Sequence, residues 1–348
     1  MNKKVFIEPT SGIWYSSFYI KGLKDVFGKE NISFSTKYFN NIERKKDPSS
    51  FDKCMYFVVV SSNNEVRKFI IDFGDSFSIA DNAYNWCDKY AKVNFNLDKT
   101  EKKYLDKIVS IPPGFGIKIW NLFETAYYCF SNFVLIQVNS SPLVNLKTYL
   151  IDYYRQFRRD SIEDYLKGSA IVNSNKKPYV FLIANLWHHK NCVEETNFFR
   201  KAFVEACKTS YCDFEGGFSS VEKDHPQREE FKNLLLKKRY PINEYIKKTK
   251  LSAIVFNTPS VHNCHGWKLG EYLAMGKAII STPLSNNLPE DLVHGKNIHF
   301  ISNIDEMKIA IKFLLDNSSY RMILEQGAKE YYSKFVSPQK VIENVLHN

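Results

Sequence analysis

Lys268 and Glu271 are the residues whose types and spacing point most directly to chemistry. They fall in the first turn of a predicted helix, residues 267–275, and residues three apart share one helical face. A helix N-terminus presents backbone N–H groups and a positive dipole end, so it suits a phosphate. A lysine there opposes the dipole, while a carboxylate on the same face can accept hydrogen bonds from vicinal hydroxyls such as those of a ribose. The alternative is a solvated Lys–Glu pair that adds roughly a few tenths of a kcal/mol.

The elements that must position this pair are short and alternate along the whole chain. Apolar runs at residues 253–256 and 278–281 flank the helix and predict buried strands. Loops after the carboxyl ends of parallel strands face the ligand crevice of open α/β sheets, so we expect the loop 257–266 to meet a ligand. We predict further strands at 5–8, 32–38, 55–61, 68–72, 92–96, 179–184 and 298–301, joined as parallel strands by crossovers. We predict further helices at 14–27, 82–90, 143–166, 194–208, 231–238, 242–248, 304–316 and 320–336. Gly216 and Gly217 are expected to form a turn.

The alternation indicates two α/β domains with a cleft between them. A polar stretch at residues 168–178 separates the two sets of elements, and its Lys177-Pro178 step favours extended chain. We therefore expect one domain at residues 1–168 and another at 169–348, with the last helix returning to the first domain. A length of 348 residues fits two domains at roughly 150 residues each.

Composition narrows the class of protein and of partner. With 44% apolar and 25% charged residues, the chain is neither disordered nor fibrous. The formal charge of +10 suits a nucleic acid, an acidic membrane surface or a phosphorylated small molecule. Seven scattered cysteines without a CxxC pair indicate reduced thiols and a cytoplasmic protein. The apolar run at residues 5–7 is too short for a signal peptide, and residues 119–138 are too interrupted for a transmembrane helix.

A longer motif surrounds Lys268 and Glu271. Residues 268–282 read Lys-Leu-Gly-Glu-Tyr-Leu-Ala-Met-Gly-Lys-Ala-Ile-Ile-Ser-Thr, followed by Leu-Pro-Glu at 288–290 and Gly-Lys-Asn at 295–297. This block resembles the C-terminal donor-binding domain of nucleotide-sugar glycosyltransferases with the GT-B fold. The resemblance implies two Rossmann-like domains facing each other across a cleft, an N-terminal acceptor side and a C-terminal donor side. It also implies that Glu271 holds the donor ribose and that Lys268 meets the diphosphate.

The same resemblance suggests further donor-binding residues. Lys190, in the loop after the strand at 179–184, is expected to point toward the diphosphate, and Tyr240 lies where relatives hold the base. Gly12, in the loop after the first strand, would let the backbone approach the transferred sugar. His262 could touch the donor phosphate or sugar. An ordinary polar loop after a buried strand is the alternative for Lys190.

One position departs from the family pattern. Many relatives carry a Glu eight positions before the ribose Glu, and this sequence has Asn263 there, so retaining or inverting chemistry stays open. His262, Cys264 and His265 are spaced too tightly for a structural zinc site, so no metal is expected. No cofactor is expected either, because the nucleotide sugar is a co-substrate.

The acceptor side needs a base if the transfer inverts the sugar. Asp72 and Asp75 follow a predicted strand on the crevice side and are the candidate catalytic residues; an Asx turn or a helix cap is the alternative. Residues 150–159 interleave aromatic and basic side chains, which fits a solvated helix or, alternatively, a contact with anionic lipid. No nucleic-acid-binding module accompanies the charge, so nucleic acid is not an expected partner.

The resemblance implies a metal-independent glycosyltransferase that moves a sugar from a nucleotide diphosphate sugar to a glycan or lipid-linked acceptor, in surface polysaccharide or glycoconjugate synthesis. We expect it in the cytoplasm or peripheral at the inner face of the membrane. The alternatives are a nucleotide-sugar epimerase on the same fold and a non-catalytic protein that binds a nucleotide or glycan.

Overall fold

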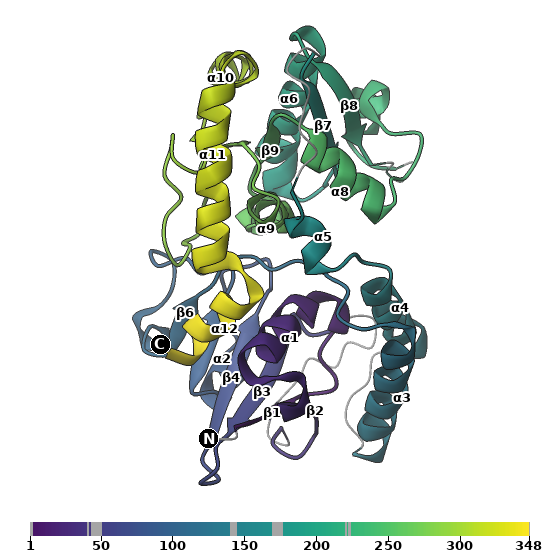
Figure 1. The fold of residues 1–348 in the computed structure, drawn as a ribbon, viewed down its shortest axis with the longest axis vertical. Coiled ribbons are helices and arrows are strands. Elements are labelled where there is room, and N and C mark those ends of the chain that lie inside the picture. Colours follow the sequence, from purple (N-terminus) through teal and green to yellow (C-terminus); the bar gives the residue numbers. More distant parts are fainter. Residues whose placement is uncertain are drawn as a thin grey trace. The chain divides into compact units, whose positions relative to one another are not determined.

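The chain folds into two compact α/β units, which confirms the predicted fold class. The computed structural model describes residues 3–39, 42, 51–139, 145–168, 177–219, 221 and 224–347. Unit 1 comprises Met1–Ile162, Asn287–Pro289 and Phe335–Asn348, and unit 2 comprises Glu163–Asn286 and Glu290–Lys334. Figure 1 labels many of the elements of both units.

Unit 1 is built on a six-stranded sheet of order β2-β1-β3-β4-β5-β6. Its strands are β1 (Lys4–Ile7), β2 (Ile32–Phe34), β3 (Cys54–Val60), β4 (Val66–Asp72), β5 (Lys89–Lys92) and β6 (Ile108–Ser110). The other neighbours in the sheet pair in parallel, but β3 is antiparallel to both β1 and β4.

Two expectations for this sheet are therefore wrong. Parallel crossovers do not join β3 to its neighbours, because the few residues between β3 and β4 form a tight turn in which Asn64 has a φ of 64°. The strand expected at residues 92–96 instead ends at Lys92. Beyond that point the Asn94 amide turns to donate to the carbonyl of Gly74 at 2.8 Å.

Helices cover this sheet, and two of them, one near each end of the chain, pack against each other in unit 1. They are α1 (Ile13–Phe27), α2 (Asp81–Trp86), α3 (Leu122–Val138), α4 (Leu146–Phe157) and α12 (Pro338–His347), with short 3-10 turns at Lys29–Asn31 and Lys102–Tyr104. α1 packs on α12 so closely that a Cβ on Gly22 would lie 2.1 Å from the Pro338 carbonyl oxygen. The two helices lie side by side in Figure 1.

Unit 2 holds two short parallel sheets. β7 (Tyr179–Ala184) pairs with β8 (Asp213–Phe218), and β9 (Val255–Asn257) pairs with β10 (Ile279–Ser281), which pairs with β11 (His299–Phe300). The backbone N–H of Ala253 donates to the carbonyl of Tyr179 at 2.7 Å, so the start of β7 lies beside the segment that enters β9. The helices are α5 (Ile162–Leu166, which begins at the last residue of unit 1), α6 (Asn197–Thr209), α7 (Arg228–Phe231), α8 (Ile242–Leu251), α9 (Trp267–Ala274), α10 (Ile304–Asp316) and α11 (Ser318–Tyr331). π-helical turns lie at Cys192–Thr196 and Tyr332–Val336, and 3-10 turns at Lys232–Leu234 and Val261–Asn263.

The turn expected at Gly216 and Gly217 is wrong, because both glycines lie inside β8. A Cβ on Gly217 would lie 2.3 Å from the carbonyl oxygen of Leu234, and Leu236 N donates to Phe218 O at 2.7 Å. The chain after α7 therefore runs against the end of β8. The helix expected at residues 231–238 is wrong, because α7 ends at Phe231 and only a 3-10 turn, Lys232–Leu234, follows it. Close backbone approach, rather than a turn, is what these glycines permit.

The long helix expected at residues 143–166 is two helices, α4 and α5, and residues 143–144 lie outside the described part of the chain. Among the described residues, no helix combines the length and the apolar character needed to cross a bilayer.

Candidate functional site

Loops that follow the strands of unit 2 are tied together by asparagine side chains. The Asn191 amide, in the turn after β7, donates to the Ser260 carbonyl at 2.9 Å and to Asn263 Oδ1 at 2.8 Å, both in the loop after β9. The Asn286 amide, after β10, donates to the Asn263 carbonyl at 3.1 Å. The carboxyl ends of β7, β9 and β10 therefore carry one connected set of loops, as a ligand site in an open α/β sheet requires.

Lys268 lies in the first turn of α9, which begins at this edge. Its ammonium is 5.1 Å from the ring centre of Tyr245 and 5.9 Å from that of Tyr272. Burial lowers the pKa of Lys268 to about 8, with Glu271 opposing that shift and Arg200 adding to it. A half-buried cation at the positive end of a helix is unfavourable for folding, which is the expected mark of a site that binds an anion.

Glu271 lies one turn further along α9 and is only 5% exposed. The Tyr245 hydroxyl, on α8, donates to Glu271 Oε2 at 2.8 Å. Burial and the neighbouring carboxylate raise the pKa of Tyr245 well above its usual value, so this hydroxyl stays a donor. The helix pair α8–α9 thus holds the Glu271 carboxylate in one orientation.

Arg200 is a functional candidate that the sequence reasoning missed. It lies on α6, is 8% exposed, and its guanidinium donates to Thr258 Oγ1 at 3.2 Å and to the Asn185 carbonyl at 3.1 Å. Burial lowers the pKa of Arg200, and the positive charge of Arg200 contributes to lowering the pKa of Lys268. A signal was present in the sequence, because Arg200 falls at helical spacing on the apolar face of residues 197–207, where an arginine is rarely placed without a partner.

The other predicted donor residues lie in different surroundings. Lys190 is exposed and directly precedes Asn191. His262 is exposed with a φ of 57°, its ring is 4.2 Å from that of His189, and its backbone N–H donates to Asn191 Oδ1 at 3.2 Å. Lys190 and His262 thus both lie in the connected loops.

Tyr240 belongs to a separate cluster. Its hydroxyl donates to Glu215 Oε1 at 2.8 Å, and Tyr179 and Lys248 bond the other oxygen of that carboxylate at 2.7 and 2.8 Å. The Lys248 ammonium contributes to lowering the pKa of Glu215. These contacts engage the hydroxyl of Tyr240 with the strand face rather than with the loops that follow it.

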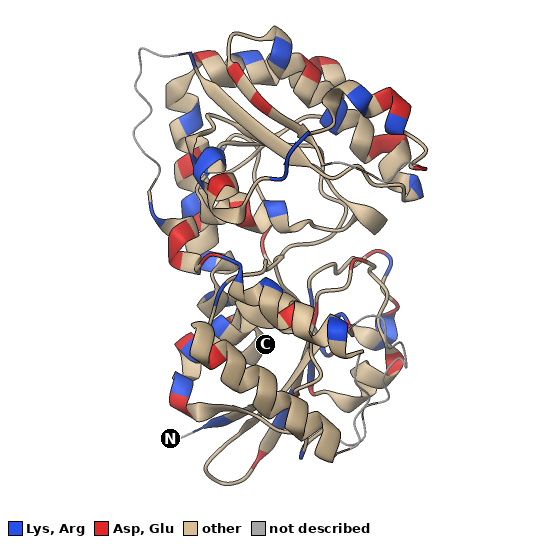
Figure 2. Cartoon of the chain, turned by 90° about the vertical axis from the view of Figure 1, so that its right-hand side faces the viewer, with Lys and Arg blue, Asp and Glu red and all other residues tan. Residues whose placement is uncertain are grey.

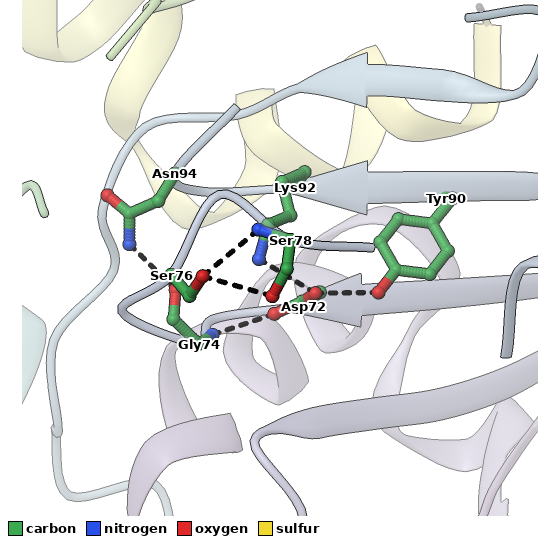
Figure 3. Close-up of polar contacts among 7 residues, drawn as sticks. All are labelled: Asp72, Gly74, Ser76, Ser78, Tyr90, Lys92 and Asn94. Carbon is green, nitrogen blue, oxygen red and sulfur yellow. Dashed lines mark hydrogen bonds and ion pairs between the residues drawn. The ribbon is translucent and has the colours of Figure 1, made fainter. Parts of the chain in front are cut away.

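In unit 1, Asp72 ends β4 and is buried in a complete set of bonds (Figure 3). Its Oδ2 accepts from the Lys92 ammonium at 2.8 Å and the Tyr90 hydroxyl at 2.6 Å, and its Oδ1 accepts from Gly74 N at 2.7 Å. Lys92 is directly opposite Asp72 in the β4–β5 register and is 1% exposed. This arrangement fixes the turn after β4, and Asn94 fixes it from the other side.

Asp75 lies in that same turn but is accessible. Its side chain is 40% exposed and forms an ion pair of 2.6 Å with Lys53. The Tyr15 ring stacks on Phe73 with 5.6 Å between the ring centroids. Partial burial of Tyr15 raises the pKa of its hydroxyl, and the negative charge of Asp75 adds to this shift. Of the two predicted carboxylates, Asp75 is the one that a hydroxyl group from solution can reach.

Gly12 is the N-cap of α1, and this helix end is occupied by a carboxylate from α4. Asp152 Oδ2 accepts from the backbone N–H groups of Ile13 at 2.5 Å and Trp14 at 3.1 Å. Burial raises the pKa of Asp152 to about 7, against the effect of these two bonds and of Arg155.

Within the described residues, no three His, Cys, Asp or Glu side chains gather as a metal site would require.

No family model matches the chain, and no curated protein matches its sequence. Among the solved structures that resemble it are glycosyltransferases. The C-terminal domain of a glycosyl transferase group 1 family protein, LpcC, from Francisella tularensis is 15% identical, over 49% of this chain and 96% of that chain, with a TM-score of 0.37. A glycosyltransferase from Rickettsia africae is 14% identical, over 78% of this chain and 69% of that chain, with a TM-score of 0.41. HepE of Anabaena, solved with UDP-glucose, is 10% identical, over 76% of this chain and 65% of that chain, with a TM-score of 0.41. The likeness is one of fold.

Proposed function

We propose that this chain is a glycosyltransferase that binds a nucleoside diphosphate sugar in unit 2 and transfers the sugar to a glycan or lipid-linked acceptor in surface polysaccharide or glycoconjugate synthesis. One observation carries the proposal: the half-buried Lys268 follows the connected loops in the first turn of α9, the buried Arg200 bonds to Thr258 in the loop after β9, and the Glu271 carboxylate lies one helical turn from Lys268. The cations suit a diphosphate and the carboxylate suits the two hydroxyls of a ribose.

The chemistry follows from the charges. The acceptor hydroxyl oxygen bonds to the anomeric carbon, the bond from that carbon to the diphosphate oxygen breaks, and the nucleoside diphosphate leaves with the electron pair. Positive charge held in place at the leaving group stabilises the transition state, so Lys268 and Arg200 do the work that a metal ion does elsewhere. In the inverting course the hydroxyl proton goes to a protein carboxylate, and Asp75 is our candidate.

Donor binding is the first test. Calorimetry with UDP, GDP, ADP and UDP-glucose should find at least one ligand, and Glu271→Gln and Lys268→Met should each weaken it by about tenfold or more, as expected for a lost bond to a charged group. Glu330→Gln and Lys312→Gln, both exposed and on α11 and α10, are the matched controls and should bind as the wild type does. Equal binding by Glu271→Gln and the wild type would refute the ribose assignment.

Turnover separates the proposal from its two alternatives. With a labelled donor and an acceptor panel, transfer supports the proposal, a new sugar nucleotide formed without acceptor indicates an epimerase, and binding without any turnover indicates a non-catalytic protein. Asp75→Asn should lower transfer with an unchanged donor dissociation constant. An Asp75→Asn variant with wild-type transfer would remove Asp75 from the mechanism.

A further inference from the structure

The outward face of α3 is apolar along its whole length. Phe123, Tyr127, Phe130, Val134 and Val138 are 84, 66, 72, 40 and 76% exposed, and their spacing of three or four residues places them on one helical face. Leu146, Leu150 and Tyr154 form a similar exposed row on α4. Single exposed apolar side chains are ordinary, but a contiguous stripe on two neighbouring helices marks an interaction surface.

The inward faces of the same helices pack in unit 1. The Asn132 amide donates to the Tyr153 hydroxyl at 2.8 Å, and the Tyr149 hydroxyl donates to the Cys129 carbonyl at 2.7 Å. The Trp120 ring stacks on Tyr128 with 4.5 Å between centroids. The stripe is therefore held outward on a fixed support and has no remaining place in this unit's core.

Charges beside the stripe are positive. Glu124 is the one acidic residue of α3, and it is ion-paired with Lys29. On α4, the carboxylate of Asp152 is buried at the N-terminus of α1, while Lys147 and Arg155 are exposed. Figure 2 looks onto this side of unit 1, where one long helix is almost free of charged residues and the helix beside it carries the basic ones.

An apolar stripe with basic residues beside it favours an anionic lipid surface over a second copy of the chain as the partner. Two copies of the chain meeting through this face would bring like charges together, whereas anionic lipid phosphates would pair with them. Phe and Tyr side chains on an amphipathic helix suit the boundary between lipid headgroups and acyl chains.

We propose that the α3–α4 face of unit 1 docks on the surface of an anionic lipid bilayer. The apolar stripe lies among the upper acyl chains, with α3 in the plane of the interface, and Lys147, Arg155 and Arg158 contact lipid phosphates. A bilayer would also hold the lipid-linked acceptor of the proposed function, but the docking surface does not depend on that function.

Sedimentation of the full chain with vesicles tests the proposal. Vesicles of phosphatidylcholine with about one third phosphatidylglycerol should bind the wild type, more tightly at low salt. Phe123→Ser/Phe130→Ser should lower binding by about tenfold or more, because each phenyl ring returned to water forfeits its transfer free energy. Met322→Ser/Ile323→Ser, at 62 and 54% exposed positions of α11, is the matched control and should bind like the wild type.

A second variant reports insertion directly. Phe130→Trp should show a blue-shifted emission on anionic vesicles and none on pure phosphatidylcholine. Three results would overturn the proposal: a wild type that stays in the supernatant with every vesicle, a stripe variant that binds as well as the wild type, or a wild-type dimer that the stripe substitutions convert to monomer. The last would identify a second copy of the chain as the occupant.

Discussion

The ion pair between Asp72 and Lys92 should be a large determinant of the stability of unit 1. The ammonium and the carboxylate lie 2.8 Å apart, and their side chains are 1% and 8% exposed. Replacing Asp72 by Asn leaves the Lys92 charge buried opposite a neutral amide that can no longer attract it. Breaking a buried pair from one side costs about 3–5 kcal/mol, so we expect Asp72→Asn to lower the free energy of unfolding by about 3 kcal/mol or more.

Lys92→Met should cost less, about 2 kcal/mol, because Asp72 keeps its bonds from the Tyr90 hydroxyl and from Gly74 N. The double variant removes both charges together, so its loss should fall short of the sum of the single losses by about 2 kcal/mol. Lys53→Met is the matched control. It breaks the exposed ion pair with Asp75, whose side chains are 63 and 40% exposed, and should cost at most about 1 kcal/mol.

The assay is native-state hydrogen exchange of peptides that contain β4 and β5, because it follows unit 1 whether or not the two units unfold together. If Asp72→Asn costs no more than Lys53→Met, or if the two single losses add in the double variant, the reasoning is wrong. A destabilised Asp72→Asn that keeps its transfer activity while folded would identify Asp72 as structural and leave Asp75 as the catalytic candidate.

Three further predictions concern single groups. Because burial lowers the pKa of Lys268 to about 8, binding of a nucleoside diphosphate should weaken by about tenfold between pH 7 and about 9.5 as the ammonium loses its proton; Lys268→Met, measured by calorimetry, should bind weakly at both pH values. The pKa of Asp152 is about 7 in the folded protein and 3.8 in the unfolded chain, so the unfolded chain loses this proton at lower pH. The free energy of unfolding should therefore fall by up to about 4 kcal/mol as the pH rises from about 4 to about 7. Urea unfolding of Asp152→Asn should lack this dependence on pH. Gly22→Ala should lower the free energy of unfolding by about 1–3 kcal/mol, because its Cβ would lie 2.1 Å from a backbone oxygen of α12, whereas thermal unfolding of Gly168→Ala, a position with open space, should match the wild type.

The sequence predicted most helices and strands because their apolar periods are local, but it did not predict how the strands pair. The direction of β3 is an example. A parallel connection needs a dozen or more residues, and Ser61–Glu65 is far too short for one, so the correct pairing could have been inferred from loop length. The prediction instead assumed that strands and helices alternate throughout this unit, although no helix lies between β3 and β4.

β8 could not be found in the same way. Its Gly216-Gly217 step lacks the β-branched residues that indicate a strand. The reason for the glycines is close backbone: a Cβ on Gly216 would lie 1.9 Å from the carbonyl oxygen of Leu182, and one on Gly217 would lie 2.3 Å from that of Leu234. Contacts between distant segments of this kind are invisible to local patterns. The bonds from Arg200 to Thr258 and from Asn191 to Asn263, which are 58 and 72 residues apart along the chain, were missed for the same reason.

The N-termini of α1 and α9 show how such distant contacts distinguish two helix ends that offer an anion the same backbone groups. Both helices begin after a glycine N-cap, Gly12 and Gly266, so their local sequences offer an anion the same backbone N–H groups. At α1 the long-range contact is a carboxylate, Asp152, which fills the helix end and would repel a phosphate. At α9 the first turn contains Lys268, and Arg200 adds a second positive charge from α6. We therefore expect a diphosphate to bind at the N-terminus of α9 rather than at that of α1.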